Sequence, residues 1–178
     1  MKGVQSTIGV VLATLVGLAQ ANSDIVTLYT NGGASYCNDG GKNWCNFAYT
    51  LVGSDPTVGK AVTASPGSTV RTNYKLNSST QLWDQNVYID DKLVSSVSTS
   101  KGEHGDIFYI SIECASGSCA QHPAHSWEDV SVVLSEADES FKHSGSWAHG
   151  ATGGAMTSPD GGKTWNFSTI NIPAQQAQ

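Results

Sequence analysis

Short segments rich in Val, Ile, Thr and Tyr alternate along the chain with clusters of Gly, Asn, Asp and Ser. None of these segments sustains the period of an amphipathic helix, whereas alternation with period two is typical of half-buried strands. The predicted strands cover residues 25–30, 46–52, 69–76, 80–90, 92–98, 107–114, 127–134 and 164–172. A helical turn is expected only at 135–141. The pattern predicts an all-β fold, an antiparallel β-sandwich or jelly roll.

Nearly the same six residues occur twice, as DGGKNW at 39–44 and as DGGKTW at 160–165. Asp-Gly favours a tight turn, so both copies predict hairpin tips, and Asp90-Asp91 predicts another hairpin. With Ser158, the second copy is similar to the Asp-box hairpin of sialidases, in which the Asp bonds its own turn. A sialidase propeller needs several four-stranded blades and three arginines, whereas this chain has 178 residues and Arg71 as its only arginine. The motif is therefore interpreted as structural, with a Trp packed behind the turn.

The N-terminus has the order of a secretory signal peptide: a lysine, an apolar run at 8–18, and then Ala19-Gln20-Ala21. Cleavage after Ala21 leaves residues 22–178 as a single domain, which we expect to be secreted and extracellular. No later apolar segment approaches the ~20 residues of a transmembrane helix, so membrane insertion is not expected. The formal net charge is −6, and the acidic surface argues against nucleic-acid binding.

Four cysteines fit an oxidising compartment and allow three pairings. Proximity along the chain favours Cys37–Cys45 and Cys114–Cys119, each closing a small loop. Zinc is the competing interpretation, but the spacing is poor for a zinc site. Glycosylation acceptor patterns, which predict exposed sites in a secreted protein, occur at Asn77 and Asn166.

Alternation along the predicted strands sorts polar side chains onto particular faces, because successive residues of a strand point to opposite sides. If three polar faces lie side by side, they form one surface that bears Arg71, Asn73, Lys75, Gln81, Trp83, Gln85, Tyr109 and Glu113. An aromatic ring covers the apolar side of a pyranose while amides bond its hydroxyls, so this surface predicts glycan binding. The alternative is that Trp83 belongs to the core and the polar groups form an ordinary solvated face.

The stretches WDQNVYIDDKLVSSVST, PAHSWEDVSVVLSEADESF and MTSPDGGKTWNFSTINIP resemble small secreted β-sandwich proteins of filamentous fungi, a group that implies no activity. More distantly, a concanavalin A-like sandwich with Gln and Glu on its polar face is similar to two enzyme families. Similarity to the glutamic peptidases implies that Gln85 and Glu113 activate water and stabilise an oxyanion. Similarity to the jelly-roll polysaccharide lyases implies that Arg71 and Gln85 neutralise a uronate, while Tyr109 or a histidine removes the C5 proton.

Metal and cofactor chemistry have little support in the sequence. His122 and His125 lie three residues apart, and Glu128 follows them, so a transition-metal site is conceivable. Metal-binding HxxxH motifs lie on a helix, however, and Pro123 between the two histidines disfavours a helix here. The acidic run at 136–139 is interpreted as an exposed turn, since calcium takes six or more oxygens from several places. No metal and no cofactor are expected.

The function predicted is that of a secreted, monomeric protein that binds cell-wall polysaccharide or a host surface. The sequence leaves open whether the protein also cleaves the polysaccharide. Two alternatives are a non-catalytic effector or cell-surface interaction protein and a glutamic-type acid peptidase. The catalytic pair, if there is one, is expected to be Gln85 and Glu113.

Overall fold

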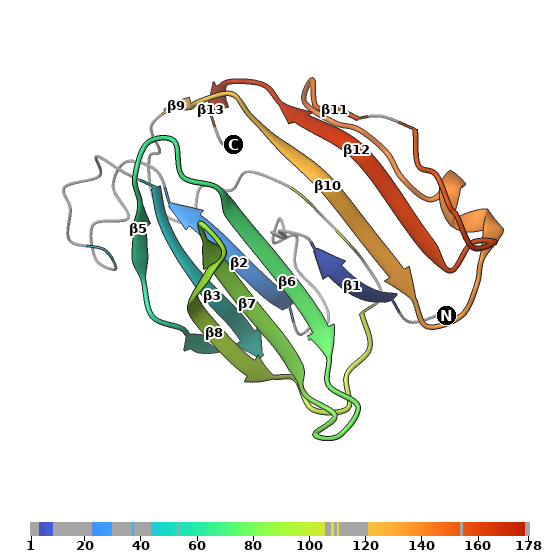
Figure 1. The fold of residues 1–178 in the computed structure, drawn as a ribbon, viewed down its shortest axis with the longest axis horizontal. Helices are drawn as coiled ribbons and strands as arrows, with labels where there is room; N and C mark the ends of the chain where they lie inside the picture. Colours follow the sequence, from blue (N-terminus) through green and yellow to red (C-terminus); the bar gives the residue numbers. More distant parts are fainter. Residues whose placement is uncertain are drawn as a thin grey trace.

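The computed structural model describes residues 4–8, 23–29, 37, 44–52, 54–105, 108, 110, 121–153 and 155–176. Nearly all of its regular structure is β-strand, and all pairings between strands are antiparallel (Figure 1). The elements are β1 (Val4–Ile8), β2 (Ser23–Tyr29), β3 (Trp44–Val52), β4 (Asp55–Val58), β5 (Val62–Ala64), β6 (Val70–Leu76), β7 (Trp83–Ile89), β8 (Lys92–Thr99), β9 (Gln121–His122), β10 (His125–Leu134), η1 (Glu139–His143), β11 (Thr152–Gly153), β12 (Thr164–Ile172) and β13 (Gln175–Gln176). The prediction of an antiparallel all-β fold is confirmed, while the finer jelly-roll arrangement stays a prediction.

Most of the predicted strands coincide with observed ones. Strands β2, β3, β6, β7, β8, β10 and β12 match seven predicted segments within a few residues. The eighth, 107–114, lies mostly outside the described residues. Strand β4 was not predicted; all four of its residues are exposed, so no buried alternation marks it. The helical turn is a 3₁₀ helix over Glu139–His143, somewhat later than expected, and the side chain of Asp138 caps it by accepting from the Ser140 amide.

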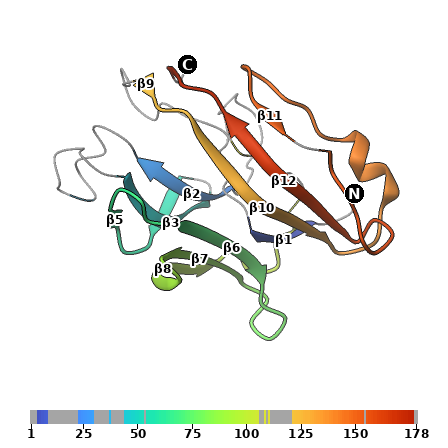
Figure 2. The same cartoon turned by 45° about the horizontal axis from the view of Figure 1, so that its top comes forward.

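The larger sheets have the strand orders β1-β10-β12-β11, β2-β3-β4 and β6-β7-β8, with β5 also pairing β3. Strands β7 and β8 are joined at Asp90 and Asp91, whose φ angles are 48° and 61°. A two-residue hairpin with positive φ at both turn positions matches the twist of its strands, and the predicted hairpin is confirmed. Figures 1 and 2 show β6–β8 and β10–β12 as separate sheets.

Two clusters of buried apolar side chains form most of the core that the structure describes. One joins β10 to β12 and contains Val130, Val132, Leu134, Trp165, Phe167, Ile170 and Ile172. The other joins β3 to the β6–β8 sheet and contains Ala48, Tyr74, Val87 and Val97. Trp127 of β10 packs against both clusters. This one indole therefore connects the two parts of the core.

The disulfide prediction is confirmed where it can be checked. Cys37 and Cys45 are bonded, which ties the start of β3 to the preceding segment. Cys114 and Cys119 lie outside the described residues, as does most of the first DGGK tip, residues 39–43.

The predicted signal peptide contributes a strand to the full chain. Val4–Ile8 forms β1, which pairs with β10 along the edge that faces away from β12. Cleavage after Ala21 would remove this strand from the mature protein, and the cleavage itself stays a prediction. Within the described residues, no helix has the length and apolar character to cross a membrane.

Candidate functional site: the polar face of the β6–β8 sheet

The register between β6 and β7 decides which polar side chains share a face. Leu76 pairs with Trp83 and Tyr74 pairs with Gln85. Directly paired residues of antiparallel strands point to the same side, so Trp83 and Gln85 lie with Tyr74 on the inner face. Trp83 is 6% exposed and Gln85 is 0% exposed.

The prediction that the polar residues form one surface is therefore wrong. Arg71, Asn73 and Lys75 lie on the outer face of β6, opposite to the face that carries Trp83 and Gln85. The physical reason is the connection between the strands, which sets the parity of the pairing and which alternation within one strand cannot reveal. Tyr109 and Glu113, also predicted for this surface, lie outside the described residues.

Two residues that were predicted for this surface but lie elsewhere, Trp83 and Gln81, make structural contacts. The Trp83 indole Nε1 donates to the carbonyl of Glu103 at 3.0 Å, which confirms the alternative interpretation of Trp83 as a core residue. Gln81 lies in the exposed turn between β6 and β7 with φ 60°, and its Nε2 donates to the carbonyl of Ser78 at 2.8 Å. Trp83 is thus buried and Gln81 belongs to a turn, so neither residue is part of the outer surface of the sheet.

Gln85 belongs to a buried polar network between β3, β7 and β8. Its Nε2 donates to Thr50 Oγ1 at 2.7 Å, and Thr50 Oγ1 lies 2.8 Å from Thr99 Oγ1. The Gln85 Oε1 atom has no hydrogen-bond partner among the described residues. A side chain enclosed in this way cannot reach a substrate on the outer face, which removes the geometric basis for the predicted catalytic pair on that face.

The outer face of β6–β8 is nevertheless rich in groups that bond hydroxyls. The register aligns one row of Asn73, Asn86 and Ser96, a second of Lys75, Asp84 and Ser98, and a third that begins with Arg71 and Tyr88. We call these eight side chains the β6–β8 face. All are half-buried or exposed. The face thus keeps three of the predicted binding residues and adds five that the sequence did not single out.

Hydrogen bonds within the β6–β8 face hold its polar groups in place. Ser96 Oγ donates to Asn86 Oδ1 at 2.8 Å, and Ser98 Oγ donates to Asp84 Oδ1 at 2.6 Å. Asn77 Nδ2 donates to the other carboxylate oxygen of Asp84 at 3.1 Å. These contacts reduce the rotamer entropy that a ligand would otherwise have to remove on binding.

An arginine–tyrosine stack closes one end of the face. The guanidinium carbon of Arg71 lies 3.8 Å from the centroid of the Tyr88 ring. Arg71 Nε is also 3.8 Å from a carboxylate oxygen of Asp91, an exposed pair that contributes little to stability. The stack fixes the orientation of both planar groups.

The second DGGK hairpin is confirmed as a structural unit. Asp160 Oδ1 accepts from the Thr164 amide at 2.7 Å and from Ser158 Oγ at 3.2 Å, while Ser158 Oγ accepts from the Gly162 amide at 2.7 Å. The indole of Trp165 is buried behind the turn and donates to the Gly162 carbonyl at 3.0 Å. The Thr164 amide, the Thr164 side chain and Ser158 hold the pKa of the Asp160 carboxyl below its usual value.

Replacing Asp160 by alanine is expected to lower the thermal midpoint by a few degrees at neutral pH, because the turn loses its acceptor. A lowered pKa in the folded state means that the carboxylate stabilises the fold above its unfolded-state pKa. The difference between parent and variant should therefore shrink as the pH falls through the lowered pKa of Asp160. Asp55→Ala, an equal charge change on exposed β4, is the control for thermal melts at several pH values. A pH-independent difference would contradict the role of the carboxylate.

The sequence predicts no metal site, and it predicts glycosylation at Asn77 and Asn166. Among residues whose positions the structure gives, no group of three or more His, Cys, Asp or Glu is arranged to hold a metal ion. Asn77 lies at the turn after β6, where its Oδ1 accepts from the amides of Ser79 and Thr80. Asn166 lies within β12, opposite Ser131 of β10. Of the two acceptor patterns, the one at Asn77 is at a hairpin tip.

The chain combines a hydrogen-bonded hairpin at Asp160, a buried polar network and an exposed polar sheet face. No protein-family model matches the sequence, and neither a curated protein nor a solved structure is significantly similar to it.

Proposed function

We propose that the protein acts outside the cell by binding neutral cell-wall polysaccharide, and that the β6–β8 face is its binding surface. The observation that carries the proposal is the alignment of amide, hydroxyl and charged groups in rows across three adjacent strands. Secretion, predicted from the N-terminal segment, is part of the proposal.

The spacing of these rows suits an extended glycan chain. Neighbouring strands lie about 4.8 Å apart, and alternate residues along one strand are about 6.8 Å apart. Side chains at these intervals can contact hydroxyls on successive sugar rings. Asn73 and Asn86 offer amide donors and acceptors, and Ser96 and Ser98 offer hydroxyls that serve as either. The Tyr88 ring at the end of the face adds an amphipathic edge of the kind found in sugar sites.

Charge favours a neutral polymer over an acidic one. Arg71 and Lys75 on the face are accompanied by Asp84 on the face and by Asp91 at its end. The formal net charge of the whole chain is −6, so a polyuronate would meet long-range repulsion. Glucans, mannans and chitin lack that repulsion.

Retention on insoluble polysaccharide tests the proposal. The parent protein should be depleted from solution by at least one of cellulose, β-1,3-glucan, mannan or chitin, and less by pectin. The double variant Asn86→Ala, Tyr88→Ala should bind about tenfold more weakly, because it removes the central amide and the ring from the face. Thr57→Ala, on exposed β4, is the matched control and should bind like the parent.

Two results would count against this function. Equal retention of the parent and the double variant, with matching thermal midpoints, would show that the β6–β8 face is not the binding surface. Failure of the parent to bind any polymer would favour the alternative of an effector or cell-surface interaction protein. A reducing-end assay on the same polymers reports cleavage separately.

A further inference from the structure

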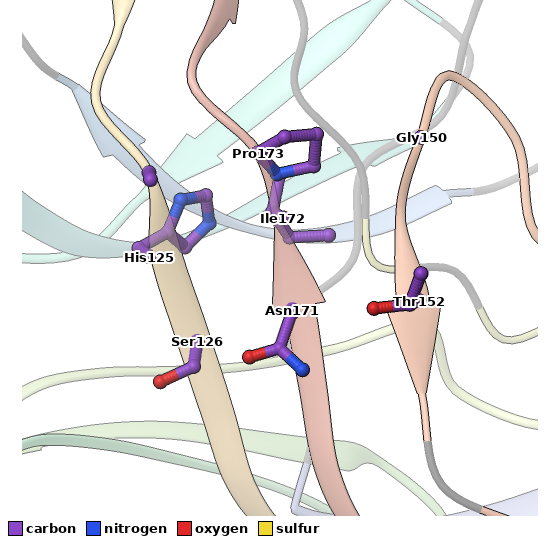
Figure 3. Close-up of a pocket in the computed structure, with 8 residues that line it drawn as sticks. His125, Ser126, Gly150, Thr152, Asn171, Ile172 and Pro173 are labelled. Atoms are coloured by element: carbon purple, nitrogen blue, oxygen red, sulfur yellow. The ribbon is translucent and has the colours of Figure 1, made fainter.

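A shallow cavity of about 440 Å³, largely open to solvent, lies on the other large sheet, near the ends of β10, β12 and β11 (Figure 3). It is remote in the sheet order from the β6–β8 face, since β10, β12 and β11 belong to a different sheet. Its volume falls within the usual range for small-molecule sites, about 300–1,000 Å³. The cavity is therefore large enough for one sugar ring.

Polar side chains from three neighbouring strands form a row in this cavity. Asn171 of β12 pairs with Ser126 of β10 on one side and with Thr152 of β11 on the other. All three side chains are exposed, and Figure 3 shows Asn171 between the other two. One amide flanked by two hydroxyls supplies donors and acceptors at intervals of about 4.8 Å, the spacing of adjacent strands. Hydroxyls on alternate carbons of a pyranose ring are separated by a similar distance.

The rim of the cavity is built from groups with restricted freedom. Gly150 has the left-handed φ of 77° and lies beside Pro173, where a Cβ on the glycine would make an ordinary van der Waals contact of 3.4 Å with the proline Cγ. His125 lines the opposite side, and its ring contacts the rings of Trp44 and Trp127 at centroid distances of 5.6 and 6.3 Å. Pro173 thus offers an apolar surface that a ligand meets without having to order it, whereas the ring of His125 packs against the two tryptophans.

The charge of the lining limits the class of ligand. The described residues that line the cavity include no Asp, Glu, Lys or Arg, and among them only His125 has an ionisable side chain. A phosphate or a uronate would have no fixed cation to pair with, so a charged ligand is disfavoured. A neutral ring with several hydroxyls matches the alternation of donors and acceptors and the apolar patch of Pro173.

We propose that this cavity is a second binding site, one that takes a single neutral pyranose, with Ser126, Thr152 and Asn171 bonding its hydroxyls. The site does not depend on the β6–β8 face or on the function proposed for it. The pyranose can be a free sugar or the terminal residue of a longer chain, and both present the same hydroxyls to the row.

Saturation-transfer NMR and calorimetry with methyl pyranosides test the site on the full-length protein. Methyl glucoside, galactoside, mannoside and N-acetylglucosaminide are the probes, and at least one should bind at millimolar concentration. Asn171→Ala should weaken this binding about tenfold, and Thr152→Val, which keeps the side-chain shape while removing the hydroxyl, should weaken it severalfold. Thr57→Ala, on exposed β4 and outside both proposed sites, should bind the pyranoside like the parent and is the matched control.

A further comparison identifies the source of the ring. Equal affinity for a pyranoside and for an oligosaccharide that ends in it indicates a site for chain ends, whereas binding of the pyranoside alone indicates a site for free sugar. Either result supports the proposal. Absence of binding to every pyranoside, or unchanged binding in Thr152→Val with an unchanged thermal midpoint, would overturn it. The variants that test this site, Asn171→Ala and Thr152→Val, lie on a different sheet from Asn86 and Tyr88, so failure here is distinguishable from failure of the polysaccharide-binding proposal.

Discussion

Replacing Trp165 by alanine is expected to lower the free energy of unfolding by about 3–5 kcal/mol, the usual cost of truncating a buried tryptophan. Trp165 is 2% exposed, belongs to the core cluster of β10 and β12, and lies 5.9 Å from the Phe141 ring, centroid to centroid. The substitution also removes the hydrogen bond from Nε1 to Gly162, so the hairpin behind the indole loses its anchor. Such a loss is a large share of the roughly 5–15 kcal/mol that stabilise a typical domain.

Guanidinium unfolding gives the measurement, with the midpoint expected to fall while the m-value is retained. Trp147→Ala is the matched control, because this indole is 48% exposed and lies over Gly153 at the edge of a sheet. The Trp147→Ala substitution should lower the free energy of unfolding clearly less than Trp165→Ala does. Equal effects of the two substitutions would mean that the hairpin tryptophan does not support the core as the structure indicates.

Local signals predicted much of this fold. Alternation located most of the strands because one face of each is buried, as in β7, where Trp83, Gln85 and Val87 are buried and their neighbours are not. Turn chemistry located the hairpin at Asp90-Asp91 and the Asp160 hairpin, since both depend on residues adjacent in sequence. Exposed β4 and the two-residue strands have no such local signal.

The site was harder to predict because it depends on pairing between strands. The two-residue turn between β7 and β8 pairs Ile89 with Lys92, so the pairing next to the turn is predictable from the sequence. Further along, an irregularity between Val87 and Tyr88 shifts the register. Between β6 and β7 the longer turn leaves the parity open, and the choice of parity moves every side chain of β7 to one face or the other. Polarity alone then misled the assignment, because Gln85 is an amide that the fold buries.

A similar change of face occurs within β10. Asp129 has a φ of 53°, and beyond it Val130, Val132 and Leu134 point into the core. Before it, His125 and Trp127 are half-buried although they have the opposite parity. A left-handed residue inside a strand resets the alternation, and Asp tolerates that conformation better than most residues. The position of Ser126 in the cavity row depends on this reset, which a strict period of two does not predict.

The burial of Gln85 leads to the second prediction with a large expected effect. Gln85→Glu should lower the free energy of unfolding at pH 7 by about 3–5 kcal/mol, because it places an uncompensated carboxylate where the side chain is 0% exposed. Burial raises the pKa of a carboxyl group above its unfolded value of about 4.3. Below about pH 4.3 the free energy of unfolding of the variant should therefore approach that of the parent. It should fall below the parent value as the pH rises toward and through the raised pKa of the folded state.

Chemical denaturation of parent and variant side by side at pH 4 and pH 7 isolates this effect, since any pH dependence of the parent cancels in the difference. Gln85→Leu is the control. It keeps the volume, removes the Oε1 atom that has no partner among the described residues, and forfeits the bond to Thr50. The Gln85→Leu substitution should lower the free energy of unfolding by less than about 1.5 kcal/mol, and this decrease should not depend on pH. A Gln85→Glu variant as stable as the parent at pH 7 would show that water reaches this side chain, and only then would a catalytic role for Gln85 regain a physical basis.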